Sequence, residues 1–173
     1  MFTLTTNPEQ TAGTLAGPPD SLVYAVVGFD GSASALRALD AASRLLSDRP
    51  GGMEIVYVAH RAVLAAGADV GGRASAEVLQ GFDDAARDLA DEVRAHLQAS
   101  HLRGAAQHWH FQRRDGAIAD QLIAAADDLA RQHGPDASVV IVVGRSEHGY
   151  HYLLGSVPRT LQRHNHYPVI VIP

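Results

Sequence analysis

Short runs of apolar, mostly β-branched residues alternate along the chain with longer stretches in which apolar residues recur at helical spacing. The clearest run is 139–143, Val-Val-Ile-Val-Val, which is typical of a strand buried on both faces of a parallel sheet. Similar runs predict strands over 22–27, 53–59, 106–112 and 169–172. The run at 106–112 is less apolar than the others, as an edge strand would be.

Helical spacing predicts four helices between these runs. The first follows Ser32 or Ser34, either of which can act as its N-cap, and the second covers about 75–98. The third starts at Asp115-Gly116, and the fourth runs from Gly155-Ser156 through Leu161. The apolar face of the third helix is expected to contain Ile118, Leu122, Ile123, Ala126 and Leu129. The glycine- and alanine-containing segment 61–73 has no clear period and is interpreted as a loop.

This alternation predicts an α/β fold: an open parallel five-stranded sheet with helices on both faces and right-handed crossovers. In such sheets a ligand binds outside the carboxyl ends of the strands, where the strand order reverses. The segments expected to meet there are 28–32, 58–72 and 144–156. The last contains three glycines and leads into a helix, a combination that suits an anion because the first backbone N–H groups of a helix have no partners within it. The alternative is an ordinary turn in which Ser156 caps the helix.

Composition excludes several classes of chemistry. The 173 residues predict one compact domain over 22–173, preceded by a flexible arm rich in Thr, Gly and Pro over 1–21. Neither cysteine nor lysine is present, which excludes thiol chemistry, a Schiff base and a Walker-type phosphate lysine. The net charge of -5 argues against a nucleic-acid partner. No apolar run is long enough for a membrane helix and the start lacks the features of a secretory signal, so we expect a cytoplasmic protein.

Two histidine pairs raise the question of a metal site. His108 and His110 would share one face of a strand, and His164 and His166 repeat the spacing near the end. Neither pair has an evident third ligand in the sequence, so a structural or surface role is favoured and no metal site is predicted.

Several segments in order resemble the universal stress protein family. They are 26–36, with Asp30-Gly-Ser after a strand, 55–59, 140–144 with Gly155-Ser-Val157, and 168–171. The resemblance covers about 22–173. It implies an adenine-nucleotide α-hydrolase-like sheet of strand order 3-2-1-4-5. It also implies a homodimer, one common mode of which pairs the last strand, Val169 to Ile172, and so shields its edge.

Many members of that family bind ATP through a loop of the form G-x-x-G, a spacer, then G-[S/T]. Gly144 matches the first glycine and Gly155-Ser156 the final pair. The middle glycine is replaced by Glu147, and the segment between Gly144 and Gly155 is two residues shorter than the family's. A carboxylate there repels a polyphosphate, and Arg145 or a divalent cation such as Mg²⁺ would offset that charge.

The resemblance implies roles for six residues. Asp30 would hydrogen-bond the adenosine moiety, the backbone of Val58 would meet the adenine edge, and Gly144, Gly155 and Ser156 with Arg145 would hold the phosphates. Each has a simpler alternative. Asp30 and Ser156 can be helix caps, the side chain of Val58 is core, and Arg145 can be a solvated loop residue.

The function predicted is a stress-response protein that binds ATP or another adenine nucleotide. It would act as a regulatory dimer with an unidentified protein partner. The alternative is a family member that has lost nucleotide binding and acts as a dimeric interaction module. Related α-hydrolases have S-G-G-x-D-S where this chain has Gly28 to Ser32. No catalytic residues are therefore predicted, and slow hydrolysis of bound ATP is left open.

Overall fold

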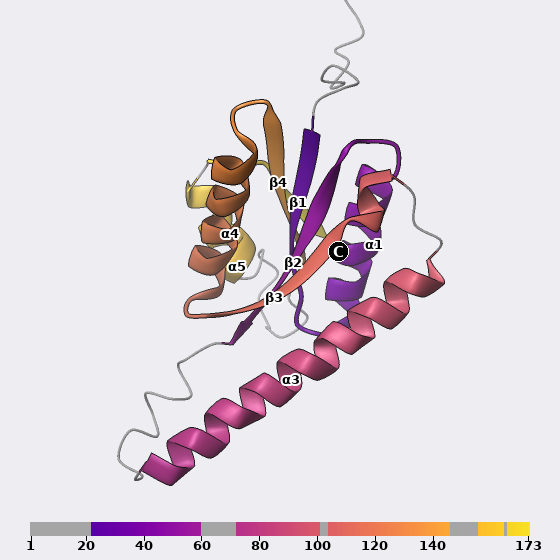
Figure 1. The fold of residues 1–173 in the computed structure, drawn as a ribbon. Helices are drawn as coiled ribbons and strands as arrows, with labels where there is room; N and C mark the ends of the chain where they lie inside the picture. Colours follow the sequence, from indigo (N-terminus) through magenta and orange to yellow (C-terminus); the bar gives the residue numbers. More distant parts are fainter. Residues whose placement is uncertain (1–21, 60–71, 101–103, 146–155, 165) are drawn as a thin grey trace, which may run out of the picture.

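The computed structural model describes residues 22–59, 72–100, 104–145, 156–164 and 166–173. Its elements follow in the order β1 (Leu22–Gly28), α1 (Ala33–Leu46), β2 (Gly51–Ala59), α3 (Gly72–Ala99), the short 3-10 helix η1 (Gly104–Gln107), β3 (Trp109–Asp115), α4 (Ile118–His133), β4 (Ala137–Gly144), α5 (Ser156–His164) and β5 (Val169–Ile172). Figure 1 shows the sheet between two layers of helices. The predicted arm, 1–21, and most of the predicted loop, 61–73, lie outside the described residues.

The five strands form one parallel sheet in the order β3-β2-β1-β4-β5, which confirms the predicted fold class and strand order. β1 lies at the centre between β2 and β4. The order reverses there, because the chain proceeds from β1 to β2 and β3 on one side and continues with β4 and β5 on the other. The carboxyl ends of β1 and β4 are therefore the place where a ligand site is expected.

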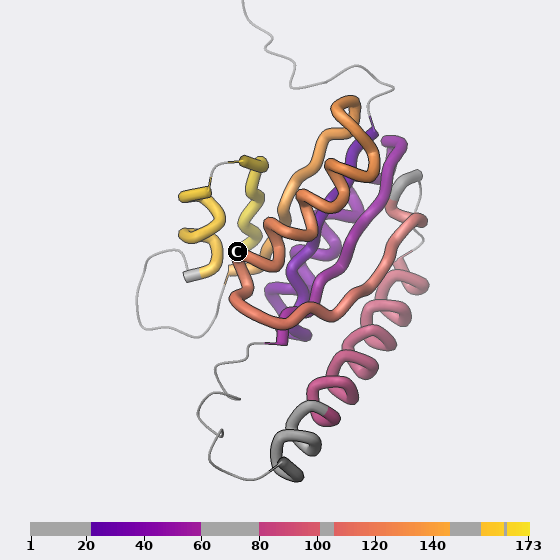
Figure 2. Tube along the Cα trace, turned by 60° about the vertical axis from the view of Figure 1, so that its left-hand side comes forward, coloured from indigo at the N-terminus to yellow at the C-terminus, as the bar shows by residue number. Residues whose placement is uncertain are grey.

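Alternate residues of the central strands build two cores, one on each face of the sheet. On one face Val27 and Ile55 pack with Leu39 of α1 and Val93 of α3. On the other face the buried residues come from the strands, α4 and α5: Val26, Val56, Ile141, Leu122 and Leu161. The tube view in Figure 2 shows α3 and α4 on opposite sides of the strands.

α1 begins where the sequence predicted. Ser32 is its N-cap, and its Oγ accepts a hydrogen bond from the N–H of Ala35 at 3.1 Å. This bond satisfies one of the free N–H groups of the first turn, and it fixes the direction in which the chain leaves β1.

The prediction for the third strand was wrong by about three residues. β3 spans Trp109–Asp115, whereas Ala106 is fully buried in η1 against the core that α1 covers. An apolar residue can thus be buried beside a sheet without joining it. The strand continues instead through Arg113 and Arg114, whose charges are paired with aspartates.

The predicted apolar face of α4 also needs one correction. Leu122, Ala126 and Leu129 are buried, but Ile118 is 37% exposed. Ile118 is the first residue of the helix, which starts shortly after the end of β3.

None of the helices in the described part of the chain is both long and apolar enough to cross a membrane.

Candidate functional site

A hollow of about 230 Å³ opens at the carboxyl ends of β1, β2 and β4. The residues that line it come from these strand ends and from the first turns of α1, α4 and α5: Gly28, Phe29, Asp30, Ser32, Ser34, Ala35, Val56, Tyr57, Val58, Ile118, Val143, Gly144, Val157 and Pro158. Three of the six predicted site residues, Asp30, Val58 and Gly144, are among them. The hollow therefore lies at the reversal of strand order, as the topology requires.

Asp30 stands exposed at the rim, directly after β1. Its Oδ1 accepts a hydrogen bond from the N–H of Ser32 at 3.0 Å. This contact shapes the turn before α1, whereas the N-cap itself is Ser32. Within the described part of the chain, the second carboxylate oxygen accepts no hydrogen bond, so it can receive one from a ligand.

Gly144 is required by packing. A Cβ at this position would lie 2.5 Å from the carbonyl carbon and oxygen of Ser34 and 2.8 Å from its Oγ. The first turn of α1 therefore rests directly on the end of β4. The family resemblance implies a phosphate-binding role for Gly144, and the packing gives a second, structural reason for glycine at this position.

The hydroxyls of Ser32 and Ser34 lie 3.1 Å apart beside Gly144. Ser34 is 4% exposed, so this contact satisfies a polar group that is almost buried. The sequence predicted these serines only as possible helix caps. Their spacing of two residues across the start of a helix was the signal that both could face the same hollow.

Val58 lines the hollow and also packs partly against the core under α4. The binding interpretation and the core interpretation of this residue are therefore compatible. Ile118 was missed as a lining residue because helical periodicity assigned it to the core.

The remaining three predicted residues are not all brought into the hollow. Arg145 is exposed and its N–H donates to the carbonyl of Ile172 at 2.7 Å, but the residue is not among those lining the hollow. Gly155 lies outside the described residues, as does Glu147. Ser156 begins α5, and the next two residues, Val157 and Pro158, line the hollow. The first turn of α5 therefore borders the site.

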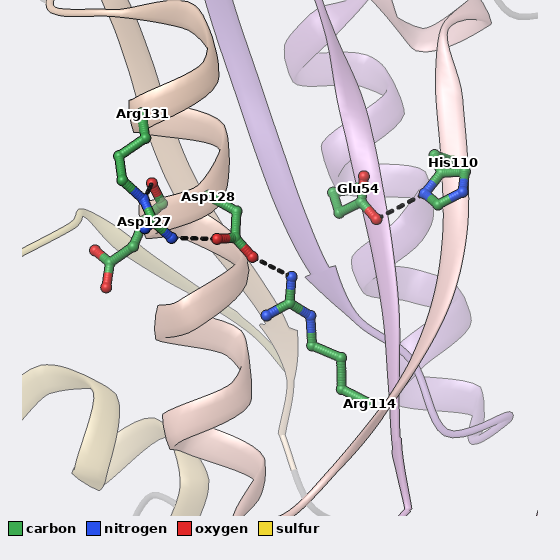
Figure 3. A network of polar contacts seen from close by, with 6 residues as sticks. All are labelled: Glu54, His110, Arg114, Asp127, Asp128 and Arg131. Atoms are coloured by element: carbon green, nitrogen blue, oxygen red, sulfur yellow. Dashed lines mark hydrogen bonds and ion pairs between the residues drawn. The ribbon is translucent and has the colours of Figure 1, made fainter.

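Two arginines fix the segment that carries Ile118 to the site. Arg113 pairs with Asp83 of α3 and donates to Asp115 at 2.7 Å, and its pKa is raised chiefly by that hydrogen bond. Arg114 donates to Asp128 of α4 at 2.6 Å, and this hydrogen bond is the main cause of a lowered pKa at Asp128 (Figure 3). The end of β3 is thus tied to helices on both faces of the sheet.

The histidine pairs do not converge on this hollow. His108 and His110 lie near the start of β3, at the opposite end of the sheet, and Nδ1–H of His164 donates to the carbonyl of Thr160 at 2.9 Å. In the described part of the chain, no three histidine or acidic side chains are grouped so that they could hold a metal ion.

A comparison with protein-family models matches residues 25–173 to the Universal stress protein family. The chain belongs to the universal stress protein family. The match covers the sheet from within β1 to the last residue, and it confirms the resemblance seen in the sequence. A search of curated proteins finds no match for this universal stress protein.

Solved structures share the fold. UspA from Lactobacillus plantarum is 22% identical with a TM-score of 0.64, and the alignment covers 88% of this chain and 99% of that one. A universal stress protein from Burkholderia pseudomallei is 25% identical with a TM-score of 0.61, covering 91% and 99%. A further universal stress protein, solved in complex with cAMP, is 24% identical with a TM-score of 0.54, covering 88% and 98%.

Proposed function

We propose that this universal stress protein binds an adenine nucleotide in the hollow between β1 and β4. The observation that carries the proposal is the convergence of Asp30, Val58 and Gly144 on one hollow, with the first turn of α5 at its border. These residues come from the ends of three separate strands, β1, β2 and β4. The solved relative that contains cAMP supports an adenine nucleotide as the ligand class.

The described hollow suits the nucleoside half of the ligand. Its volume of about 230 Å³ is below the roughly 300–1,000 Å³ of sites that enclose a whole drug-sized molecule. Val58, Ile118 and Val157 provide apolar surface for the base, and the backbone of Val58 provides polar groups for its edge. The free oxygen of Asp30 accepts a hydrogen bond from a ribose hydroxyl.

The phosphates would extend from Gly144 towards the amino end of α5. The backbone N–H groups there and the positive end of the helix dipole attract an anion, and Gly155 and Ser156 occupy this end in the sequence. Arg145 follows Gly144 and is exposed, so its side chain is free to turn towards a phosphate.

Mg²⁺ would enter the site bound to the phosphates of a nucleoside triphosphate, as their counterion. Asp30 is the only carboxylate among the described lining residues, and it lies at the proposed nucleoside end. The phosphate oxygens would therefore supply most of the ligands to Mg²⁺, which commonly keeps several waters and few protein ligands.

The proposed activity is binding without dedicated catalysis. Among the described lining residues the hydroxyl groups are those of Ser32, Ser34 and Tyr57, and no histidine lines the hollow to activate one of them as a base. Measurement of phosphate release from ATP tests this part: turnover that disappears with Ser34→Ala would contradict it.

We also propose that the protein acts as a regulatory homodimer paired through β5. This strand ends one edge of the sheet, is apolar throughout (Val169–Ile172), and leaves Ile170 36% exposed. The unpaired N–H and C=O groups of an apolar edge strand are a template for pairing with another chain.

Calorimetry on nucleotide-stripped protein tests the binding proposal, with ATP, ADP, AMP and cAMP as ligands. We expect saturable binding of at least one of them, and we expect Asp30→Asn to weaken it about tenfold through loss of a charge-assisted hydrogen bond. The control is Asp136→Asn, an exposed aspartate in the turn before β4, which should change the affinity less than twofold.

A second candidate is an interaction module that has lost nucleotide binding. The replacement of the family's middle glycine by Glu147 and the shortened segment favour it. The two candidates are separated by extracting freshly purified protein with acid and chromatographing the supernatant. A stoichiometric nucleotide in the extract supports the first, and no saturable binding below millimolar concentration supports the second.

A further inference from the structure

A second hollow, of about 550 Å³, lies at the opposite end of the sheet from the proposed nucleotide site. It is open to solvent and is bounded by the start of β2 and β3 and by the last turn of α4. Tyr24, Glu54, His108, His110 and His133 are among its lining residues, and none of them lines the proposed nucleotide site.

A missing side chain creates the floor of this second hollow. Gly52 lies opposite Tyr24 in the pairing of β1 with β2. A Cβ on Gly52 would lie 3.6 Å from both Tyr24 Cε1 and His108 Cβ, and 2.8 Å from the carbonyl oxygen of His108. The close approach of the His108 backbone thus requires glycine at position 52. Because Gly52 has no side chain, a gap remains across the sheet between the side chains of Tyr24 and His108.

Two of the residues that line the second hollow form an aromatic stack. The rings of Tyr24 and His133 stack with centroids 4.0 Å apart and an angle of 16° between their planes. The Tyr24 hydroxyl lies 3.0 Å from His133 Nδ1, which holds the two rings in this arrangement. A planar group can stack on the outer face of an aromatic pair of this kind.

Glu54 is the one acidic residue among the described residues that line the second hollow. The side chain of Glu54 is only 13% exposed, and its Oε1 accepts a hydrogen bond from His110 Nδ1 at 2.9 Å (Figure 3). His110 is 72% exposed and is therefore an easily displaced partner for a carboxylate that has lost most of its water. The carboxyl end of α4, at His133, adds the negative end of a helix dipole, and no arginine is among the described lining residues.

We propose that this second hollow binds a guanidinium group. A guanidinium ion is planar and always charged, and it presents paired N–H donors to a carboxylate while its face stacks on an aromatic ring. Glu54 and the Tyr24–His133 stack offer these two partners within one hollow. A bound metal is a less suitable occupant, because the described histidines and carboxylates are not grouped for metal coordination.

The guanidinium group belongs either to a free small molecule or to an arginine side chain of another protein. Residues 1–21, which precede β1 in the sequence, contain no arginine and so cannot supply the group.

NMR titration of the full chain tests the proposal and separates the two sources. The probes are agmatine, a blocked Gly-Gly-Arg-Gly-Gly peptide, and cadaverine as an ammonium control. Saturable shifts of the Tyr24 and His133 ring signals are expected with agmatine, and weaker binding is expected with cadaverine. Tighter binding of the peptide than of agmatine assigns the site to a partner's arginine, and the reverse order assigns it to a small molecule.

Two variants and a control make the result specific. Glu54→Gln keeps the shape and the hydrogen bond but removes the charge, so agmatine binding should weaken at least about tenfold. Glu92→Gln, an exposed glutamate on α3 on the other face of the sheet, should change it less than twofold. His110→Ala frees a carboxylate oxygen and should leave agmatine binding as strong or stronger.

Several results would overturn the proposal. They are the absence of saturation below roughly 10 mM agmatine, unchanged binding in a folded Glu54→Gln variant, and a tenfold loss in His110→Ala. Submillimolar binding of Zn²⁺ that excludes agmatine and is lost in His110→Ala would replace the proposal with a metal site.

Discussion

Arg114 at the end of β3 donates from Nη2 to Oδ2 of Asp128 on α4 at 2.6 Å, across the open border of the sheet. Its neighbour Arg113 points to the other face, where it pairs with Asp83 of α3 and lies 5.9 Å from the centroid of the Phe82 ring. Two consecutive residues of an edge strand thus bind helices on opposite faces. An edge strand has only one neighbour to hold it, so these side chains supply part of what a second strand would provide.

Removal of this contact should reduce stability in a pH-dependent way. Arg114 is 17% exposed, so Arg114→Met keeps the packing of its stem and removes the charge. We expect a loss of about 1 kcal/mol in the free energy of unfolding at pH 7. Arg87→Met, which removes an exposed pair with Asp84, should cost less than about 0.5 kcal/mol.

The sign of the pH dependence follows from the lowered pKa of Asp128. The pair stabilises the native state above the unfolded-state pKa of about 4, and this contribution disappears as the pH falls through the lower native value. Urea denaturation at pH 7 and pH 3 should therefore show the difference between wild type and Arg114→Met at pH 7 and a smaller difference at pH 3. An equal difference at both would contradict the assignment.

Tyr167 should titrate abnormally late. Burial, with a hydrogen bond from its hydroxyl to Asp127 Oδ1 at 2.6 Å, raises the pKa of Tyr167 to about 12. The neutral phenol is favoured in the native state, so its contribution to stability is fully present below pH 10 and is lost as the pH rises towards 12. NMR of ring-labelled tyrosine should show one resonance titrating near 12 that is missing in Tyr167→Phe. A titration of that resonance near 10 would show that the contact with Asp127 is absent in solution.

Two glycines should respond to alanine in opposite directions. Gly144→Ala forces a Cβ against the backbone of Ser34, so we expect a loss of about 2 kcal/mol or more. Gly81→Ala lies in the exposed part of α3 with nothing within 4 Å of the new Cβ, and it should gain about 0.5–1 kcal/mol from helix propensity. Thermal denaturation of the two variants measures both. A neutral Gly144→Ala would mean that α1 and β4 are farther apart than the structure shows.

Loss of the α1 cap should be measurable without disturbing the core. Ser32→Ala removes the acceptor for the Ala35 N–H and should cost about 1 kcal/mol in chemical denaturation. Ser47→Ala at the other end of α1 removes a hydrogen bond to the carbonyl of Arg44 in an exposed position and should cost less than about 0.5 kcal/mol. Equal costs would indicate that Ser32 does not cap the helix.

The proposed dimer predicts that a charge on the β5 edge dissociates it. Ile170→Lys places an ammonium group on an exposed position of this strand and should convert dimer to monomer in light scattering at micromolar concentration. Gln98→Lys, an exposed change on α3, should leave the mass unchanged. A wild-type protein that is monomeric at the same concentration would contradict pairing through β5.

Most of the helices and strands could be predicted from the sequence, because the patterns that indicate them are local or periodic. The buried run at 139–143 and the cap at Ser32 each depend on a few adjacent residues, and both are confirmed. The true position of β3 was not readable, because Ala106 is as apolar as a strand residue and only the packing of η1 on α1 distinguishes it. Strand order came from the family resemblance, and periodicity alone would have left it open.

The site was readable only in part, for the same physical reason. Asp30, Val58 and Gly144 follow strands whose ends must meet, so their convergence could be expected. The contact of Gly144 with Ser34 joins residues far apart in the chain, and no local sequence pattern predicts it. The exposure of Ile118 likewise depends on how α4 packs against the sheet, and helical periodicity carries no information about that packing.

The absence of a side chain at Gly144 has a mechanical consequence. With the first turn of α1 packed directly on the end of β4, a ligand that enters the hollow contacts the start of a helix that packs on the core of one face of the sheet. Occupancy should therefore slow the exchange of amide hydrogens along the first turns of α1 as well as at the strand ends. Ligand binding in the hollow would in this way affect the far end of α1 through a rigid packing contact.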